Sequence, residues 1–428
     1  MKVRLTYCLP IIASLLFCQP ALANPRELSL ADSIALAVKN NPALQIVEAR
    51  KEQSTWAVEE AKSNKYLSIN YTHIDKRSTE PYTWVASLQA VAPYNYFHNQ
   101  ITASVPLYTG GKIESIIDQA NLGLSVSELQ ITAAKQQLKL ETSIGYYNVM
   151  QCQTLLEVAR QTVEDFSAHL KRVQKMYDTG VVPWHDVLQT KVRLANAENN
   201  LVKAQNNYDL ATYSLNKTIG LPLHSEIKLT EPLTDKQATS TDGDITAYGL
   251  AHRPEIAQTQ ASIKIEQAQV QIAKSEQRPT VLLTGTMAWA DTGFAGTDNK
   301  NWTAMVVTQI NLFDSGNTKA KVKKAQFGVL AAQKQLRQAQ DNISLEINDA
   351  YLSIQEAEKR IATNKIAVEE AGVNFKIAQR RYSAGVGTNL DVMDAELALN
   401  QAKTNLINAL YDYNTSKARL DKAMGTSI

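Results

Sequence analysis

A stretch that occurs twice, 205 residues apart, constrains this chain more than any other feature. The matching positions are Tyr382 with Tyr177, Gly385 with Gly180, Asp391 with Asp186 and Val392 with Val187. The match continues on both sides of this stretch, from Leu312 and Leu107 to Gly425 and Gly220. A constant offset over more than a hundred residues indicates an internal duplication. Any fold for this chain must therefore contain two copies of one unit.

The N-terminus has the pattern of a secretory signal peptide. Lys2 and Arg4 precede a short apolar run, and Ala21-Leu22-Ala23 offers a cleavage site of small residues. The run is too short to span a bilayer, so we expect residues 1–23 to be removed. A lipoprotein signal around Cys18 is the alternative, but Phe17 stands where a small residue should precede a lipidated cysteine.

The charge balance of the mature chain excludes several classes of partner. Without Lys2 and Arg4, the 44 basic residues become 42 and equal the 42 acidic residues. A net charge of zero gives no bulk attraction for nucleic acid or for an acidic membrane surface. Only Cys152 remains after cleavage, so we expect no internal disulfide. No later segment has eighteen consecutive apolar residues, so we expect no membrane-spanning helix.

Each copy is predicted to contain a strand hairpin, at about 66–107 in the first copy and about 280–312 in the second. The strands alternate apolar and polar residues and are about ten residues long, the length that crosses a membrane when tilted. We expect the apolar side chains to face lipid and the polar ones to face a lumen. The expected lipid-facing residues are Ile101, Val105, Val306 and Ile310, and the expected lumen-facing residues are Thr102, Ser104 and Gln309.

Long helical patterns follow each hairpin. They cover residues 112–178 and 184–219 in the first copy, and residues 318–383 and 389–424 in the second. A helix of about 66 residues is about 100 Å long, which suggests coiled-coil packing. We therefore divide the mature chain into repeat 1 (24–220), an irregular linker or belt (221–247) and repeat 2 (248–428).

No pattern in the chain indicates catalysis, a cofactor or a metal site. The six histidines are dispersed, with no pair at the helical spacing that metal sites use. Gly110-Gly111-Lys112 is not a phosphate-binding loop, because Pro106 and Ile113 occupy positions that the motif reserves for other residues. We expect no enzyme activity. Gly180 and Gly385 can be explained as helix ends, and Asp391 as a capping box with Thr388.

The order of elements and the repeated turn resemble the TolC family of outer-membrane efflux proteins, over essentially the whole mature chain. The residues that carry the resemblance are Asn41-Pro42, Pro106-Leu107-Tyr108, Gly110-Gly111, Leu312-Phe313, Gly316 and the two turns with Tyr382, Gly385, Asp391, Val392 and Asp394. The resemblance implies a mainly α fold with a membrane β-barrel. It implies a homotrimer whose twelve-stranded barrel takes four strands from each chain and continues into a coiled-coil tunnel. Membrane physics agrees in part, because open sheet edges are not tolerated in lipid.

The resemblance also implies roles for residues at the turns. Tyr382, Asp391 and Asp394 match the inner helix pair that constricts the periplasmic end of the tunnel, and Asp186 matches the outer pair that ties to it. The best-known family member has an arginine where this chain has Gly387, so a closed-state lock must use other groups, with Asn389 as one candidate. Rings of Asp391 and Asp394 would attract cations, and their crowding would raise their pKa values.

The two turns match the place where periplasmic adaptor proteins dock. The candidate docking residues are Gly180, Gly385 and Gly387, together with Trp184, an unusual residue that could set adaptor preference. The implied function is a passive exit duct in the outer membrane for drugs or secreted proteins. An adaptor and an inner-membrane pump would supply the cargo. Two alternatives are a structural trimer that tethers the envelope and a periplasmic coiled-coil adaptor, although an adaptor has no need of lipid-facing strands.

Overall fold

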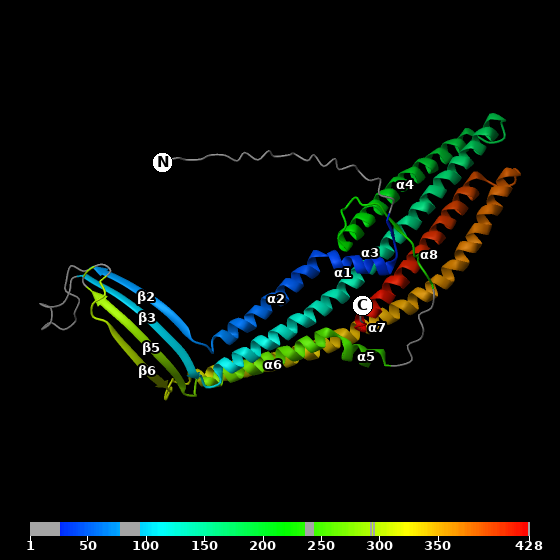
Figure 1. Ribbon diagram of the computed structural model, residues 1–428. Helices are drawn as coiled ribbons and strands as arrows, with labels where there is room; N and C mark the ends of the chain where they lie inside the picture. The colour runs from blue at the N-terminus through cyan, green and yellow to red at the C-terminus, as the bar shows by residue number, and fades with distance from the viewer. Residues whose placement is uncertain (1–25, 78–94, 236–243, 292, 294–295, 427–428) are drawn as a thin grey trace, which may run out of the picture.

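A computed structural model describes residues 26–77, 95–235, 244–291, 293 and 296–426. The predicted signal peptide and the loop of the first hairpin lie outside these residues. The molecule is elongated, with a β-sheet at one end and the turns between long helices at the other (Figure 1). The fold is mainly α-helical, as the sequence predicted.

The sheet contains four antiparallel strands in the order β2-β3-β5-β6. These strands are β2 (Ser68–Arg77), β3 (Asn95–Tyr108), β5 (Thr280–Asp291) and β6 (Asn301–Gln309). Tyr71, Ile101, Met287 and Trp302 stand opposite one another across it. The adjacent row is Asn70, Thr102, Thr286 and Thr303. Because neighbouring positions point to opposite faces, the sheet has a largely apolar face and a more polar face.

The predicted alternation of the strand holds at Val306 but does not extend to Ile310. Val306 pairs with Leu283 in the apolar rows, whereas Gln309 pairs with Thr280. Strand β6 ends at Gln309, so the prediction that Ile310 is part of the strand was wrong. The strand stops here because the chain turns towards the next helix, where Asp314 accepts hydrogen bonds from the amides of Gly316 and Thr318. Which face contacts lipid stays a prediction.

Two helices of 67 residues, α3 (Lys112–Asp178) and α7 (Asn317–Ser383), extend from the sheet to the far end. Near the sheet they pack against α2 (Pro42–Ser63) and α6 (Pro254–Ser275). Towards the far end they pack against α4 (Trp184–Ile219) and α8 (Asn389–Ala423). Helix α3 also packs against α6 and α8, which joins the two repeats.

Shorter elements surround the middle of the long helices. They are β1 (Arg26–Leu28), α1 (Leu30–Asn40), β4 (Ile227–Leu229) and α5 (Ile245–His252). Strands β1 and β4 pair in parallel, and Leu28 is buried in a core with Leu138, Leu215 and Ile219. The linker was therefore wrongly predicted to be irregular throughout, because β4 and the start of α5 lie within it. No helix in the described residues is long and apolar enough to cross a membrane.

Candidate functional site: the two helix tips

The chain reverses direction twice at the far end, between α3 and α4 (tip 1) and between α7 and α8 (tip 2), as Figure 1 shows. In tip 1 the amide of Gly180 donates to the carbonyl of Tyr177 at 2.8 Å. The amide of Gly385 makes the equivalent bond to Tyr382 in tip 2 at 3.0 Å. Both glycines have a φ of +75°, a conformation that side chains disfavour. The repeated glycines are therefore required by the backbone.

An apolar cluster holds the two tips together. Val173 of α3 and Val187 of α4 are fully buried, and Tyr382 of α7 is 5% exposed. The other buried members are Phe375, Ala378, Val392, Ala395 and Leu399. The outer pair (α3 and α4) and the inner pair (α7 and α8) thus share one small core at the tips.

A buried polar cluster around Asn389 crosses this core. The side-chain Nδ2 of Asn389 donates to the main-chain carbonyl of Asp186 at 3.3 Å and to Oγ1 of Thr190 at 3.2 Å. Its Oδ1 lies 2.7 Å from Nε2 of His169. His169, Thr190 and Asn389 are all at most 3% exposed. Asn389, the candidate named from the sequence, therefore connects α8 to both helices of the outer pair.

Tyr382 lies at the end of α7, in the buried core of the tips. Its hydroxyl is buried and has no hydrogen-bond partner among the described residues, so no hydrogen bond ties it to Asp186. Burial, and then the negative charge of Asp186, raises the pKa of Tyr382 to about 12. Its ring instead packs against His169, with ring centroids 5.3 Å apart. At the tips, the polar connection between the helix pairs runs through Asn389.

Asp391 forms the capping box that the sequence predicted. Its Oδ2 accepts from the amide of Thr388 at 2.9 Å, and its own amide donates to Oγ1 of Thr388 at 3.1 Å. These bonds, with a smaller contribution from Arg381, lower the pKa of Asp391. Within one protomer the pKa of Asp391 is therefore lowered, and the rise expected from crowding of carboxylates in a trimer stays a prediction. Asp394 lies along the same surface hollow as Asp391, and Arg381 of α7 also lines it.

The candidate docking residues are mostly exposed. Trp184 is 43% exposed and lies against Tyr177, with ring centroids 5.0 Å apart. A Cβ atom at Gly180 or Gly385 would meet open space. One at Gly387 would lie 3.1 Å from both Cβ of Arg381 and the amide nitrogen of Tyr382. A side chain at position 387 would therefore crowd the end of α7.

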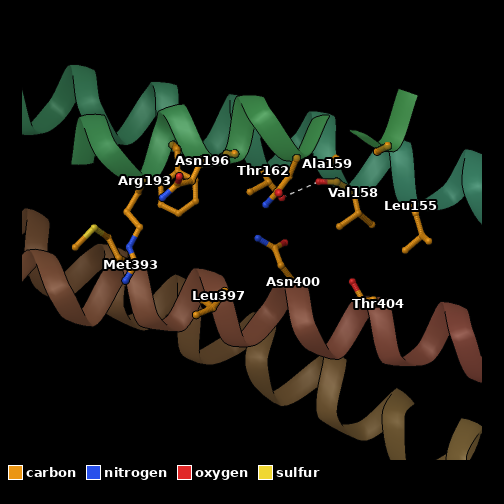
Figure 2. Close-up of a pocket in the computed structure, with 14 residues that line it drawn as sticks. Leu155, Val158, Ala159, Thr162, Arg193, Asn196, Met393, Leu397, Asn400 and Thr404 are labelled. Carbon is orange, nitrogen blue, oxygen red and sulfur yellow. Dashed lines mark hydrogen bonds between the residues drawn. The ribbon is translucent and has the colours of Figure 1, made fainter. Parts of the chain in front are cut away.

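A groove of about 320 Å³ lies between the outer pair and α8 (Figure 2). Its lining mixes apolar and amide side chains, with Arg193 of α4 and Met393 and Asn400 of α8 among them. Near this groove Glu396 is only 2% exposed and accepts a hydrogen bond from Asn400 at 3.3 Å. Burial, and then the charge of Asp165, raises the pKa of Glu396 to about 7.

Sequence reasoning missed His169, Thr190 and Glu396. They lie inside helices where a polar residue gives no periodic signal, and their partners are far away in the chain. The signal that could have found Glu396 is the pattern of α8, because it lies three residues before the buried Leu399. Among the described residues no group of three or more His, Cys, Asp or Glu side chains could hold a metal ion.

The sequence model of the family described as "Outer membrane efflux protein" matches residues 33–221 and 249–426. The chain belongs to this family. The two matched segments correspond to the two repeats.

Several characterised proteins are similar to the chain. Outer membrane protein TolC of Escherichia coli (strain K12) is 23% identical over 316 residues, which are 70% of this chain and 64% of that protein. The chain thus spans somewhat less than two thirds of that relative. TolC of Vibrio cholerae is also 23% identical, over 93% of this chain and 91% of that protein. The alkaline protease secretion protein AprF of Pseudomonas aeruginosa is 23% identical over 92% of this chain and 83% of that protein.

Solved structures share the fold. The Campylobacter jejuni CmeC outer membrane channel has a TM-score of 0.82 and 17% identity, over 92% of this chain and 85% of that chain. The outer membrane protein VceC of Vibrio cholerae has a TM-score of 0.78 and 20% identity, over 92% of this chain and 96% of that chain. These likenesses support the architecture of a sheet continued by long helices.

Proposed function

We propose that this protein is a passive exit duct in the outer membrane, assembled as a homotrimer and supplied by a periplasmic adaptor and an inner-membrane pump. Family membership supports the duct. Its relatives are named both for efflux, such as the solvent efflux pump protein SrpC of Pseudomonas putida, and for protein secretion, such as AprF. The observation that carries the proposal is a sheet with an apolar face, continued by helices of about 100 Å.

The open edges of the sheet support an oligomer. Within the described residues β2 and β6 each pair with only one neighbour. Unpaired strand edges are costly in lipid, so the sheets of several copies must join into a closed barrel. Four strands from each of three copies give the twelve strands that the family resemblance implies.

The duplication predicts how the copies meet. Helix α3 packs against α8 within the chain, and the duplicated equivalent of this contact would join α7 to α4. The described parts of one chain show no packing of that extent between α4 and α7. Both helices instead expose apolar side chains, namely Leu188, Val192 and Val202 on α4 and Leu352, Ile366, Val373 and Ile377 on α7. In a ring, α7 of one copy would cover α4 of the next.

The tips carry the two remaining roles, which are the gate and the adaptor-docking surface. The gate consists of Tyr382, Asp391 and Asp394 on the inner pair, with Asp186 on the outer pair. The adaptor docks on the tip surface around Gly180, Trp184, Gly385 and Gly387. The exposed aromatic pair at Trp184 supports docking, and the shared core with the cluster around Asn389 supports a closed tip.

Two measurements separate the duct from the alternatives. Carbonate extraction of membranes tests insertion, because a peripheral periplasmic adaptor would be released and a barrel would be retained. Conductance of the purified protein in planar bilayers then separates a duct from an envelope tether. Discrete conductance steps are expected, and correctly inserted trimers that never conduct would contradict the proposal.

A further inference from the structure

A gate that opens and closes needs a reversible contact between the inner and outer helix pairs, and His169 makes one. It lies on α3, is 3% exposed, and its Nε2 is 2.7 Å from Oδ1 of Asn389, the first residue of α8. No other side chain in the described tips joins α3 to α8 through so short a hydrogen bond. The pair therefore connects the start of α8 in the inner pair to the last turns of α3 in the outer pair.

The hydrogen bonds of Asn389 determine which nitrogen of His169 carries the proton. A main-chain carbonyl can only accept, so the amide nitrogen of Asn389 must face the carbonyl of Asp186. The amide oxygen then faces His169, and Nε2 must donate to it. His169 is therefore a neutral imidazole protonated on Nε2, and any further proton must bind Nδ1. Among the described residues the one hydrogen bond of the His169 ring is that of Nε2.

The surroundings of His169 oppose a positive charge. Burial lowers the pKa of His169 most, and Arg172 of the same helix lowers it further. The bond to Asn389 and the charge of Asp186 on α4 act in the opposite direction without reversing the shift. On the side of α7, the imidazole of His169 packs against the ring of Tyr382. A proton on Nδ1 is thus bound more readily when the helices separate and water reaches the imidazole.

We infer that His169 and Asn389 form a latch between the outer and inner helix pairs of one protomer, and that protonation of His169 releases it. The inference rests on the proposed function, because it assigns the residue that positions the gate. The direction of the pH effect follows from the difference between the pKa of the buried imidazole and that of the released one. The released imidazole has the higher pKa, so the latch is intact above the ordinary histidine pKa of about 6.5 and weakens as pH falls below it.

The duplication shows that the latch is specific to this contact. The positions that correspond to His169 and Asn389 in the other repeat are Asn374 and Trp184. Both are exposed in this chain. The buried pair therefore does not arise simply from duplicating the unit, since only the contact between α3 and α8 contains it.

Channel recordings on purified trimers in planar bilayers test the latch at about pH 7.5 and about pH 5.5. Wild type is expected to be mostly closed at the higher pH and to open several-fold more often at the lower pH, because the released imidazole binds the proton more readily than the buried one. His169→Gln keeps an N–H donor and cannot titrate, so it should stay mostly closed at both values. His169→Ala removes the donor and should open at both.

His185→Gln is the matched control, because His185 is also a tip histidine but is exposed. It should keep the acid response of wild type. An acid response that survives in His169→Gln, or that disappears in His185→Gln, would overturn the assignment to His169.

Hydrogen–deuterium exchange of the tip peptides gives a readout that does not depend on conduction. After correction for the intrinsic effect of pH, the wild-type tips should exchange faster at the lower pH, and His169→Gln should abolish the difference. Tips that exchange equally at both values would overturn the latch. If exchange follows the expected pattern but no variant conducts, the latch stands and the exit duct is refuted.

Discussion

The two tips have the same backbone turn but opposite surroundings. Tyr177 of tip 1 is 39% exposed and lies beside the exposed Trp184. Its duplicate Tyr382 in tip 2 is 5% exposed and packs against His169. Duplication preserved the glycine and its hydrogen bonds, which the backbone requires, whereas the side chains around it diverged. This difference supports the proposal that tip 1 docks a partner and tip 2 carries the gate.

The same divergence continues into the helices that follow. Helix α8 is preceded by Thr388, which forms a capping box with Asp391, whereas the N-cap of α4 is Pro183, which makes no side-chain cap. Glu396 of α8 is buried, but its counterpart in α4, Lys191, is exposed and places its ammonium group 5.3 Å from the ring of Trp184. Matched substitutions at duplicated positions can therefore test the comparison directly.

The largest expected effect comes from truncating the two tyrosines. Tyr382→Ala should destabilise the protein by about 3–5 kcal/mol, the usual cost of deleting a buried aromatic side chain. Tyr177→Ala should cost about 1 kcal/mol or less, because the ring is partly exposed and keeps only its contact with Trp184. Thermal unfolding followed by helical circular dichroism measures both.

Tyr382→Phe is the control for this pair. It removes a buried hydroxyl that has no partner among the described residues, so stability should rise by about 1 kcal/mol. Equal losses for the two alanine variants would contradict the assignment of different surroundings to the two tips.

The next largest expected effect is the pH dependence of stability that the buried carboxyl group of Glu396 causes. The pKa of Glu396 is raised from 4.5 to about 7, so the unfolded chain releases this proton before the folded one does, and stability falls as pH rises from about 4.5 to about 7. Glu396→Gln should therefore increase stability at about pH 8, by about 3 kcal/mol at most, and change little at about pH 5. Unfolding free energies from denaturant titrations at the two pH values measure this.

Lys191→Gln is the duplicated control. Its side chain is exposed, so we expect no comparable difference in stability between the two pH values. A stability gain for Glu396→Gln that is the same at both values would show that the carboxyl group does not titrate in this range.

Much of the architecture could be predicted because it follows from local patterns. Alternation predicted the strands, long helical periodicity predicted α3 and α7, and the Thr388-x-x-Asp391 spacing predicted a cap. The contacts of the site could not be predicted in this way. His169 and Asn389 are 220 residues apart, and neither has a neighbour in sequence that marks it as buried. The pairing of β1 with β4 also joins distant segments, and strands of three residues are too short to show a period.

The smallest expected effect concerns ion selectivity. Asp391→Asn combined with Asp394→Asn should lower the preference for cations, because the entrance loses two carboxylates per protomer. Arg381→Gln should raise that preference, since this guanidinium lines the same hollow. The lowered pKa of Asp391 predicts that its charge persists below the ordinary aspartate range, so its contribution should be constant at neutral and mildly acidic pH.

Reversal potentials in a salt gradient measure this selectivity. Asp178→Asn removes an exposed carboxylate of tip 1 that is not part of the proposed gate, so it is the control and should leave selectivity nearly unchanged. If the double variant and wild type were equally selective, these aspartates would serve only as helix caps.

The most direct test of the account is a comparison of Asn389→Ala with Trp184→Ala in planar bilayers. These residues occupy duplicated positions, one buried between the helix pairs and one exposed. The account predicts that at neutral pH Asn389→Ala trimers conduct far more often than wild type, whereas Trp184→Ala trimers remain closed. A closed Asn389→Ala channel, or equal opening by the two variants, would contradict the assignment of the gate to tip 2.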